Sequence, residues 1–230
     1  MAGLGTRFSE AGYEKPKPLI DVDGIPMIAA VVNSLNLDAN YIFIVQKEHS
    51  KKYNLESYLV NLVPNSKIIE IDGVTDGAAR TTLAAKSLID NDSPLIIANS
   101  DQIIVWDSLK FLNILKAGHA ISLFYADSPK WSYAKIKNGL IIEVAEKVVI
   151  SDQATTGIYG WRTGADYVKY AEQMINKNIR TNNEFYICPV YNEAIQDNQL
   201  VFPYAVDRMF GIGTPEDLDI FLKKQKQEEQ

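Results

Sequence analysis

The sequence has few of the residues that bind zinc or form disulfides: one cysteine, Cys188, and two histidines, His49 and His119, in 230 residues. A single cysteine cannot form a disulfide within the chain, and the histidines stand in unrelated contexts, whereas a zinc site needs three or four ligands. No apolar run approaches the ~20 residues of a membrane-spanning helix, and no secretory signal is recognisable. These absences predict a cytoplasmic protein outside the membrane.

Basic residues are also scarce, with 23 lysines and arginines against 29 acidic residues and a net charge of -6. Broad nucleic-acid binding needs a basic face against the phosphate backbone, so the composition argues against that class of partner. The length suits one large α/β domain with a full hydrophobic core. We therefore expect a single domain that acts on small molecules.

Short apolar and β-branched runs alternate with segments of helical spacing along the first half of the chain. The runs that predict strands buried on both faces are 41–46, 66–72, 94–101 and 120–127. The segments that predict helices between them are 25–35, 77–89 and 108–116. This alternation is typical of repeated βα units on a parallel sheet.

The pattern becomes richer in strands after residue 133. Two strand-like runs within 133–147 are joined by Asn138-Gly139, which indicates a hairpin because both residues tolerate positive φ. Helical patterns return at 164–178, 185–196 and 214–224. We expect a small β-rich region that follows the βα core.

The first twenty residues combine small residues with cations. Gly3 and Gly5 let backbone N–H groups approach an anion closely, and Arg7 and Lys17 add a forked and a mobile cation. This combination predicts phosphate binding. A dinucleotide-binding G-x-G-x-x-G loop is the weaker alternative, because Phe8 stands at the third glycine position and two X-Pro bonds interrupt the following helix.

Ordered motifs run along almost the whole chain: AGLGTRF (2–8), PKPLI (16–20), DGIPMI (23–28), DGAARTTLAA (76–85), LIIANSDQI (95–103), EVAEK (143–147), TTGIYGW (155–161), NNEFYICPVYNEAI (182–195) and GIGTPEDL (211–218). In this order they resemble the nucleotidyltransferase family that makes nucleotide-sugars and related activated metabolites. The resemblance implies an α/β fold: a single-domain, three-layer α/β/α, Rossmann-like and glycosyltransferase-A-like architecture with a mixed, mostly parallel sheet and a small β-rich acceptor region. It also implies a nucleotide-binding half over about 1–119, an acceptor-binding half over about 120–213 and a C-terminal helix over 214–230.

The resemblance also implies a reaction without a protein nucleophile, in which an acceptor phosphate attacks the α-phosphorus of a nucleoside triphosphate and pyrophosphate leaves. Arg7 would bind the β- and γ-phosphates, and Lys17 would lie near the α-phosphate. Asp101 would bind Mg²⁺, a hard cation that takes one or two carboxylates together with phosphate oxygens and water. Read on its own, Asp101 is also compatible with a turn that ends a strand.

The remaining site residues follow from the same resemblance. Those implied to bind the nucleotide are Ala2, Gly3, Leu4, Gly5, Thr6, Thr75, Gly77, Ala78 and Ser100. Lys147 would hold the acceptor phosphate, and the residues implied to contact the rest of the acceptor are Glu146, Thr156, Gly157, Glu184 and Tyr133. Trp131, Tyr133 and Tyr186 are aromatic residues that either close over the acceptor or belong to the core.

Two departures from the family pattern bear on the site. Many relatives carry an aspartate as a second metal ligand just before the IGTPED-like turn, where this chain has Gly211. Relatives also have a buried strand of about six residues before the glycine loop, where this chain has only Met1. We therefore expect an incomplete metal site and an N-terminal strand that is missing from this sequence.

The predicted function is transfer of a nucleotidyl group, with CMP favoured over UMP and dTMP, to a sugar phosphate or a non-sugar phosphate such as phosphocholine or an amino-acid phosphate. The ending GIGTPEDL is similar to that of capsule- and teichoic-acid-type enzymes, which implies a role in cell-surface polysaccharide synthesis. Two alternatives stay open: a glycosyltransferase of related fold, and a non-catalytic regulatory homologue. The sequence leaves the oligomeric state open, with a homodimer among the expectations.

Overall fold

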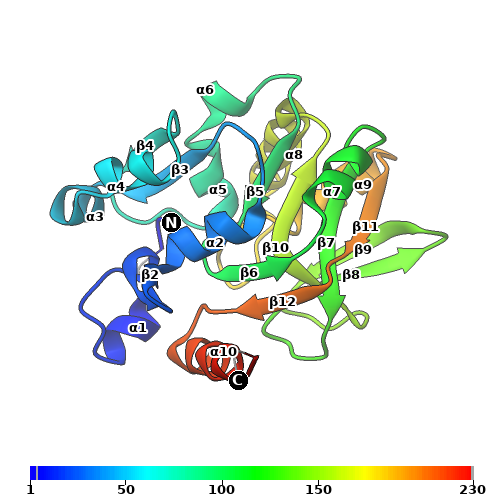
Figure 1. Cartoon of the computed structure of the whole chain (residues 1–230). Helices are drawn as coiled ribbons and strands as arrows, with labels where there is room; N and C mark the ends of the chain where they lie inside the picture. The colour runs from blue at the N-terminus through cyan, green and yellow to red at the C-terminus, as the bar shows by residue number, and fades with distance from the viewer. Residues whose placement is uncertain (4, 229–230) are drawn as a thin grey trace. The chain divides into compact units, whose positions relative to one another are not determined.

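The computed structural model describes residues 1–3 and 5–228, which form two compact units (Figure 1). Unit 1 consists of Met1–Val74, Asn99–Trp106 and Arg208–Gln230. Unit 2 consists of Thr75–Ala98 and Asp107–Asp207. The chain therefore leaves and re-enters unit 1 twice, so that segments far apart in the sequence share one core.

Unit 1 contains short helices and paired strands. Its helices are α1 (Thr6–Glu10), the 3-10 helix η1 (Lys17–Leu19), α2 (Met27–Leu35), α3 (Lys47–Tyr53), α4 (Leu55–Leu62) and α10 (Pro215–Glu228). Its strands are β1 (Asp21–Val22), β2 (Ile25–Pro26), β3 (Ile42–Gln46), β4 (Lys67–Ile71), β6 (Gln102–Val105) and β12 (Arg208–Gly211). β3 pairs with β4 in parallel, whereas β12 pairs with β6 and β1 with β2 in antiparallel fashion.

Helix α2 organises the core of unit 1, because it buries side chains on two faces. Met27 and Val31 pack with Phe8 and Ile212 in one cluster, and Ile28 packs with residues of β3, α3 and α4 in another. Burial of each such side chain contributes about 1.5–3 kcal/mol. The helix ends at Asn36, which takes the left-handed conformation of a C-cap.

Unit 2 is built on a mixed sheet of six strands in the order β11-β7-β10-β8-β9, with β5 paired to β10. The strands are β5 (Leu95–Ala98), β7 (His119–Tyr125), β8 (Ser132–Lys137), β9 (Leu140–Glu146), β10 (Gln153–Trp161) and β11 (Val201–Ala205). The helices are α5 (Ala78–Leu83), α6 (Lys86–Ile89), α7 (Ser108–Ile114), α8 (Gly164–Asn176) and α9 (Val190–Gln196). Residues 154–161 of β10 are all buried, which marks this strand as the centre of the unit.

The prediction of a mostly parallel sheet is wrong. Among the described strands, only β11–β7 and β3–β4 pair in parallel, and β10 runs antiparallel to β5, β7 and β8. Short loops join β7 to β8 and β9 to β10, whereas a parallel connection needs a crossover of a dozen or more residues. The sheet is therefore mixed, as expected, but mainly antiparallel.

Most predicted elements are confirmed, with differences at their ends. The hairpin of β8 and β9 turns at Asn138 and Gly139, which both have positive φ. The helix predicted over 77–89 is interrupted, and α5 and α6 lie on either side of residues 84–85. The helix predicted from residue 185 begins only after Pro189, a residue that fits a helix start but not its interior.

Candidate functional site

The glycine loop in unit 1 is anchored at both ends. Ala2 is buried, and its carbonyl accepts a hydrogen bond of 2.8 Å from Gln46 Nε2. Gly5 has φ +65° at the start of α1, and a Cβ atom there would lie 3.2 Å from Lys17 Cβ. A side chain at position 5 would therefore be strained and would press against the lysine.

Lys17 and Asp101 form an ion pair in unit 1, and their side chains are only 22% and 25% exposed. Asp101 follows Ser100 in the bend before β6, and its backbone carbonyl accepts a hydrogen bond of 2.9 Å from Ile212 N–H. A Cβ atom on Gly213 would lie 2.7 Å from Asp101 Oδ2. The absence of a side chain at Gly213 thus leaves room for the ion pair.

Arg7 lies in the first turn of α1, and its side chain is exposed. In the part of the chain that the structure describes, its guanidinium makes no ion pair with a carboxylate. Phe8 beside it is buried and makes an edge contact with Tyr13, which fixes the helix. The forked donors of Arg7 remain available to an anion.

The segment around Gly77 in unit 2 is held tightly by its own hydroxyl groups. Thr75 Oγ1 donates to the Gly77 carbonyl at 3.0 Å and lies 2.6 Å from Thr81 Oγ1. Gly77 has φ +127°, and a Cβ atom there would lie 2.4 Å from both the nitrogen and the oxygen of the Phe185 backbone. Only glycine fits this close backbone approach.

The same segment is bonded to the chain around Phe185. Phe185 N–H donates to the Asp76 carbonyl at 2.8 Å, and Ala79 N–H donates to the Phe185 carbonyl at 2.9 Å. The Asp76 carboxylate binds Arg80 Nε at 2.7 Å and Arg180 Nη2 at 2.9 Å. Burial raises the pKa of Asp76, but the hydrogen bond and the charges of the two arginines outweigh it and lower the pKa below its usual value.

Lys147 follows directly on β9, and its side chain is exposed. Its Nζ donates a hydrogen bond of 2.6 Å to Tyr186 Oη and lies 4.6 Å from the centroid of the same ring. The neighbouring Glu146 carboxylate accepts a hydrogen bond from Ser132 Oγ. Burial raises the pKa of Glu146, although Ser132 and the charge of Lys147 oppose this effect.

The other predicted acceptor residues differ in exposure. Tyr133 is fully buried and donates a hydrogen bond of 2.7 Å to the Ser128 carbonyl. Thr156 is also buried, and its hydroxyl is hydrogen-bonded to Ser122. Gly157 has φ +79° and lies where the pairing of β10 with β7 shifts register. Glu184 carries an exposed side chain.

No family model matches the sequence. The nucleoside-diphosphate-sugar pyrophosphorylase of Vibrio cholerae RC9 has a similar structure, with a TM-score of 0.86 and 26% sequence identity, over 97% of this chain and 98% of that one. This chain has the fold of the sugar-nucleotide nucleotidyltransferases. The resemblance predicted from the ordered motifs is confirmed at this level.

Two further comparisons agree with this fold family. The putative glucose-1-phosphate thymidylyltransferase of Bacillus anthracis matches with a TM-score of 0.76 and 20% identity, over 97% of this chain and 92% of that one. The bifunctional protein GlmU of Methanococcus maripaludis is 27% identical over 168 residues, which are 69% of this chain and 38% of the relative. The match therefore spans well under half the length of that relative.

Within this nucleotidyltransferase fold, the structure brings several predicted residues together inside each unit. Lys17 and Asp101 meet in unit 1 although 84 positions separate them, and Glu146 and Lys147 share the end of β9 in unit 2. Further predicted nucleotide-binding residues lie at Gly3 and Thr6, both exposed, and at Ala78, the first residue of α5. Leu4 lies outside the described residues. The binding roles of all these residues stay predictions.

Sequence reasoning missed three pairings in this nucleotidyltransferase fold. They are Arg180 with Asp76, Ser132 with Glu146, and the Tyr186 hydroxyl with Lys147. Each pairing joins residues 14 or more positions apart, so local sequence spacing does not predict it. For Tyr186, the only signal was an aromatic side chain within a family motif.

A metal ion in this chain would need ligands from the described His, Cys, Asp or Glu side chains. The described residues contain no group of three or more His, Cys, Asp or Glu side chains that could hold a metal ion. Mg²⁺, however, often takes only one or two carboxylates and completes its shell with substrate phosphates and water. Asp101 provides one carboxylate. The residue that follows it, Gln102, is the register partner of Gly211 in β12. This donor set fits a cation that is shared with a phosphate ligand.

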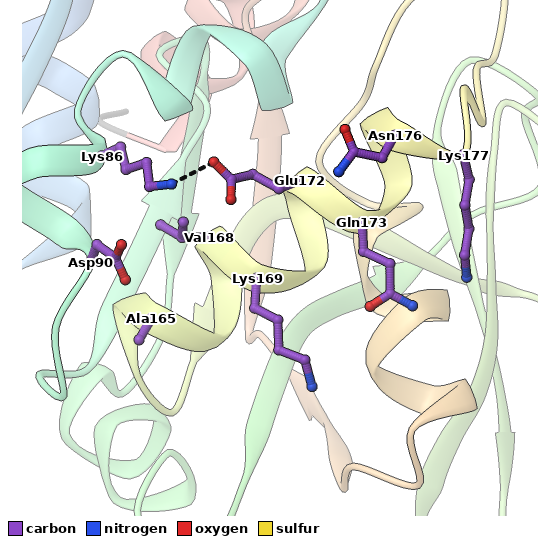
Figure 2. A pocket seen from close by; sticks show the side chains of 9 residues that line it. All are labelled: Lys86, Asp90, Ala165, Val168, Lys169, Glu172, Gln173, Asn176 and Lys177. Carbon is purple, nitrogen blue, oxygen red and sulfur yellow. Dashed lines mark hydrogen bonds and ion pairs between the residues drawn. The ribbon is translucent and has the colours of Figure 1, made fainter.

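A separate depression of about 610 Å³ lies along α6 and α8 in unit 2 (Figure 2). Lys86 Nζ binds Glu172 Oε1 there at 2.6 Å, and Lys169 and Lys177 are also paired with carboxylates. None of the predicted site residues lines this depression. No helix in the described part of the chain is both long enough and apolar enough to cross a membrane.

Proposed function

We propose that this chain is a nucleotidyltransferase that moves a nucleoside monophosphate from a nucleoside triphosphate to a phosphorylated small molecule and releases pyrophosphate. The observation that carries the proposal is the Lys17–Asp101 ion pair beside Gly213, in a chain with the pyrophosphorylase fold. A cation next to a potential metal ligand, with a glycine packed beside them, suits a phosphate group in transfer.

In the proposed reaction, an oxygen of the acceptor phosphate forms a bond to the α-phosphorus. The bond between the α-phosphorus and the bridging oxygen of the β-phosphate breaks, and pyrophosphate leaves with that electron pair. No protein nucleophile is needed, so the rate depends on alignment and on neutralisation of charge.

The residues predicted to bind the triphosphate lie in unit 1. Lys17 would bind the α-phosphate, and Arg7, whose guanidinium is unpaired with any carboxylate of the described chain, would bind the β- and γ-phosphates. Asp101 would hold Mg²⁺ together with phosphate oxygens, and this ion would neutralise charge on the phosphates. The backbone of the glycine loop and Ser100 would complete the contacts with the nucleotide.

The residues predicted to contact the base and the acceptor lie in unit 2. The Thr75–Ala78 segment would contact the base, since its rigid backbone presents fixed donors and acceptors. Lys147 would bind the acceptor phosphate. Glu146, Thr156, Gly157, Glu184 and Tyr133 would contact or shape the remainder of the acceptor.

We further propose CTP as the preferred nucleotide, with UTP and dTTP as the competing substrates. The basis is the similarity of the GIGTPEDL ending to capsule- and teichoic-acid-type enzymes, and it implies an acceptor used in cell-surface polysaccharide synthesis. The names of the similar structures add sugar 1-phosphates to the acceptors worth testing. Phosphocholine and amino-acid phosphates complete the panel.

The test is pyrophosphate release in the presence of Mg²⁺, with each nucleoside triphosphate combined with each acceptor. We expect release that requires one pair of substrates and falls about 100-fold or more in Arg7→Ala and Lys147→Ala. Lys169→Ala is a matched control, because Lys169 is also an exposed lysine beside a tyrosine in unit 2. A folded protein that binds nucleotide but releases no pyrophosphate would favour the glycosyltransferase or the non-catalytic alternative.

A further inference from the structure

The backbone of Lys147 is in an unusual conformation. Its φ is +56°, and every other described non-glycine residue with positive φ is an asparagine or an aspartate. Those two residue types tolerate the left-handed region, whereas lysine does not favour it. Such strain persists where the surroundings fix it, and here the Lys147 N–H donates to the Trp131 carbonyl at 3.1 Å. The side chain thus leaves β9 in a direction that an extended residue would not give it.

The Lys147 ammonium contacts the side chain of Tyr186. Tyr186 Oη accepts its hydrogen bond at 2.6 Å, and the ring lies 4.6 Å from Nζ. The phenol oxygen accepts from the ammonium, and its own O–H has the Glu184 carboxylate as a further partner. An anion placed on Lys147 would therefore meet an ammonium that the phenol oxygen holds in place.

Tyr186 is a neutral partner for the lysine. Burial raises the pKa of Tyr186 above its usual value, the hydrogen bond and charge of Lys147 act in the opposite direction, and the nearby Glu184 carboxylate adds to the rise. The hydroxyl therefore stays protonated near neutral pH, and it does not cancel the charge of Lys147. A carboxylate at the same position would cancel much of that charge.

The position of Tyr186 is fixed through its neighbour in the chain. Phe185 is buried, its backbone is hydrogen-bonded to Asp76 and Ala79, and Arg180 lies over its ring at 3.8 Å from the centroid. The backbone that precedes Tyr186 is therefore held rigidly, whereas the side chain of Lys147 is long and flexible.

From these contacts, we infer that Tyr186 is a positioning residue that holds the Lys147 ammonium for an acceptor phosphate. The inference rests on the proposed function, because it assigns the acceptor phosphate to Lys147. It adds a residue whose hydroxyl determines how tightly the acceptor binds and leaves the nucleotide unaffected.

The chain contains a matched pair for comparison. Lys169 Nζ on α8 donates to Tyr170 Oη at 3.2 Å and lies 4.4 Å from the ring, much as Lys147 does at Tyr186 (Figure 2 shows Lys169). Lys169, however, also pairs with Asp197 at 2.9 Å. This second pair has similar local geometry, and its charge is already neutralised.

The experiment compares Tyr186→Phe with Tyr170→Phe, each of which keeps the ring and removes only the hydroxyl. For Tyr186→Phe, we expect KM for the acceptor to rise about 5- to 10-fold, with kcat and KM for the nucleotide changed less than about two-fold. For Tyr170→Phe, all three constants stay at the wild-type values. In a Lys147→Met background, removal of the Tyr186 hydroxyl should have less than half of its effect on acceptor KM, because the two residues act together.

A second measurement needs no turnover. Limited acylation followed by mass spectrometry gives the reactivity of Lys147 relative to the other lysines, and loss of the Tyr186 hydroxyl should raise it at least two-fold. If wild-type protein releases no pyrophosphate with any substrate pair, the proposed function fails, and the acylation ratio alone decides whether Tyr186 holds Lys147. Unchanged acceptor KM in an active enzyme, or an unchanged acylation ratio, would overturn the inference.

Discussion

The two lysines proposed to bind phosphate have opposite kinds of partner. Lys17 in unit 1 is paired with the carboxylate of Asp101, and both side chains are largely buried. Lys147 in unit 2 is exposed and bonded to the neutral hydroxyl of Tyr186. A carboxylate lies next to Lys147 in the sequence as well, but Glu146 is hydrogen-bonded to Ser132.

The difference indicates which lysine needs a further cation. The ion pair of Lys17 has little net charge, so binding of phosphates there requires extra positive charge, such as Arg7 and a metal on Asp101. Lys147 forms no ion pair among the described residues, so its ammonium can bind an anion directly. We therefore expect metal dependence to come from unit 1 and acceptor affinity from unit 2.

The largest expected effect is that of Asp101→Asn. The variant retains the shape of the side chain and removes the proposed metal ligand, so kcat for pyrophosphate release should fall about 1,000-fold. Asp21→Asn is the control, because Asp21 is an exposed carboxylate of unit 1 that binds only the Gly24 N–H at 3.1 Å among the contacts of the described chain. Activity of Asp101→Asn within about three-fold of wild type would contradict the metal assignment.

Replacement of Lys147 separates charge from backbone strain. Both Lys147→Asn and Lys147→Ala should lower kcat/KM for the acceptor by about 100-fold, because the cation is lost. Lys147→Asn should be more stable than Lys147→Ala by about 0.5–1 kcal/mol, since asparagine tolerates positive φ. Urea unfolding measures the second difference. Equal stability of the two variants would argue against strain at this position.

A gain of function is expected from Gly211→Asp. In the register of β12 and β6, Gly211 is the partner of Gln102, next to Asp101. A second carboxylate there should lower the Mg²⁺ concentration for half-maximal activity by about 10-fold. Gly211→Asn is the control, because it adds a side chain of the same size without charge. An equal effect of both variants would assign the change to packing.

The smallest expected effect is on the pH dependence of stability. Burial raises the pKa of Glu146 in the folded protein, so its contribution to stability is present below the ordinary carboxyl pKa and is lost as pH rises through the raised value. Ser132→Ala removes a hydrogen bond that lowers the pKa of Glu146. The variant should therefore lose more stability than wild type as pH rises. Glu146→Gln should abolish this component. Unfolding midpoints measured at about pH 4 to 8 check the sign, and a stability that rises with pH through Glu146 would contradict it.

The sequence predicted the elements well where periodicity is strong. The strands at 41–46 and 120–127, the hairpin at Asn138-Gly139 and the helix over 164–178 are all present. The direction of strand pairing was not predictable in the same way, because the βα alternation of the first half was extended to a region without crossover helices. β10 shows this most clearly, since its three partner strands are all antiparallel to it.

The site was predictable from ordered motifs only as a set of residue types. The order of the motifs selected Lys17, Asp101 and Lys147 as candidate site residues, but the partner of each lysine depends on contacts across 84 and 39 positions. The positive φ of Lys147 could not be predicted from the sequence either, because lysine is not a residue type that favours this conformation. Gly77 was predicted to let the backbone approach a nucleotide base, and the structure shows the backbone of Phe185 packed against this glycine.

The left-handed lysine at the end of β9 also has a consequence for how the gene can change. A single third-base substitution converts any lysine codon into an asparagine codon, and asparagine suits the backbone of position 147 better than lysine does. The shortest mutational route from Lys147 therefore leads toward a more stable protein that lacks the cation. Drift alone would erode the lysine, so its persistence in a population would report selection for the charge itself.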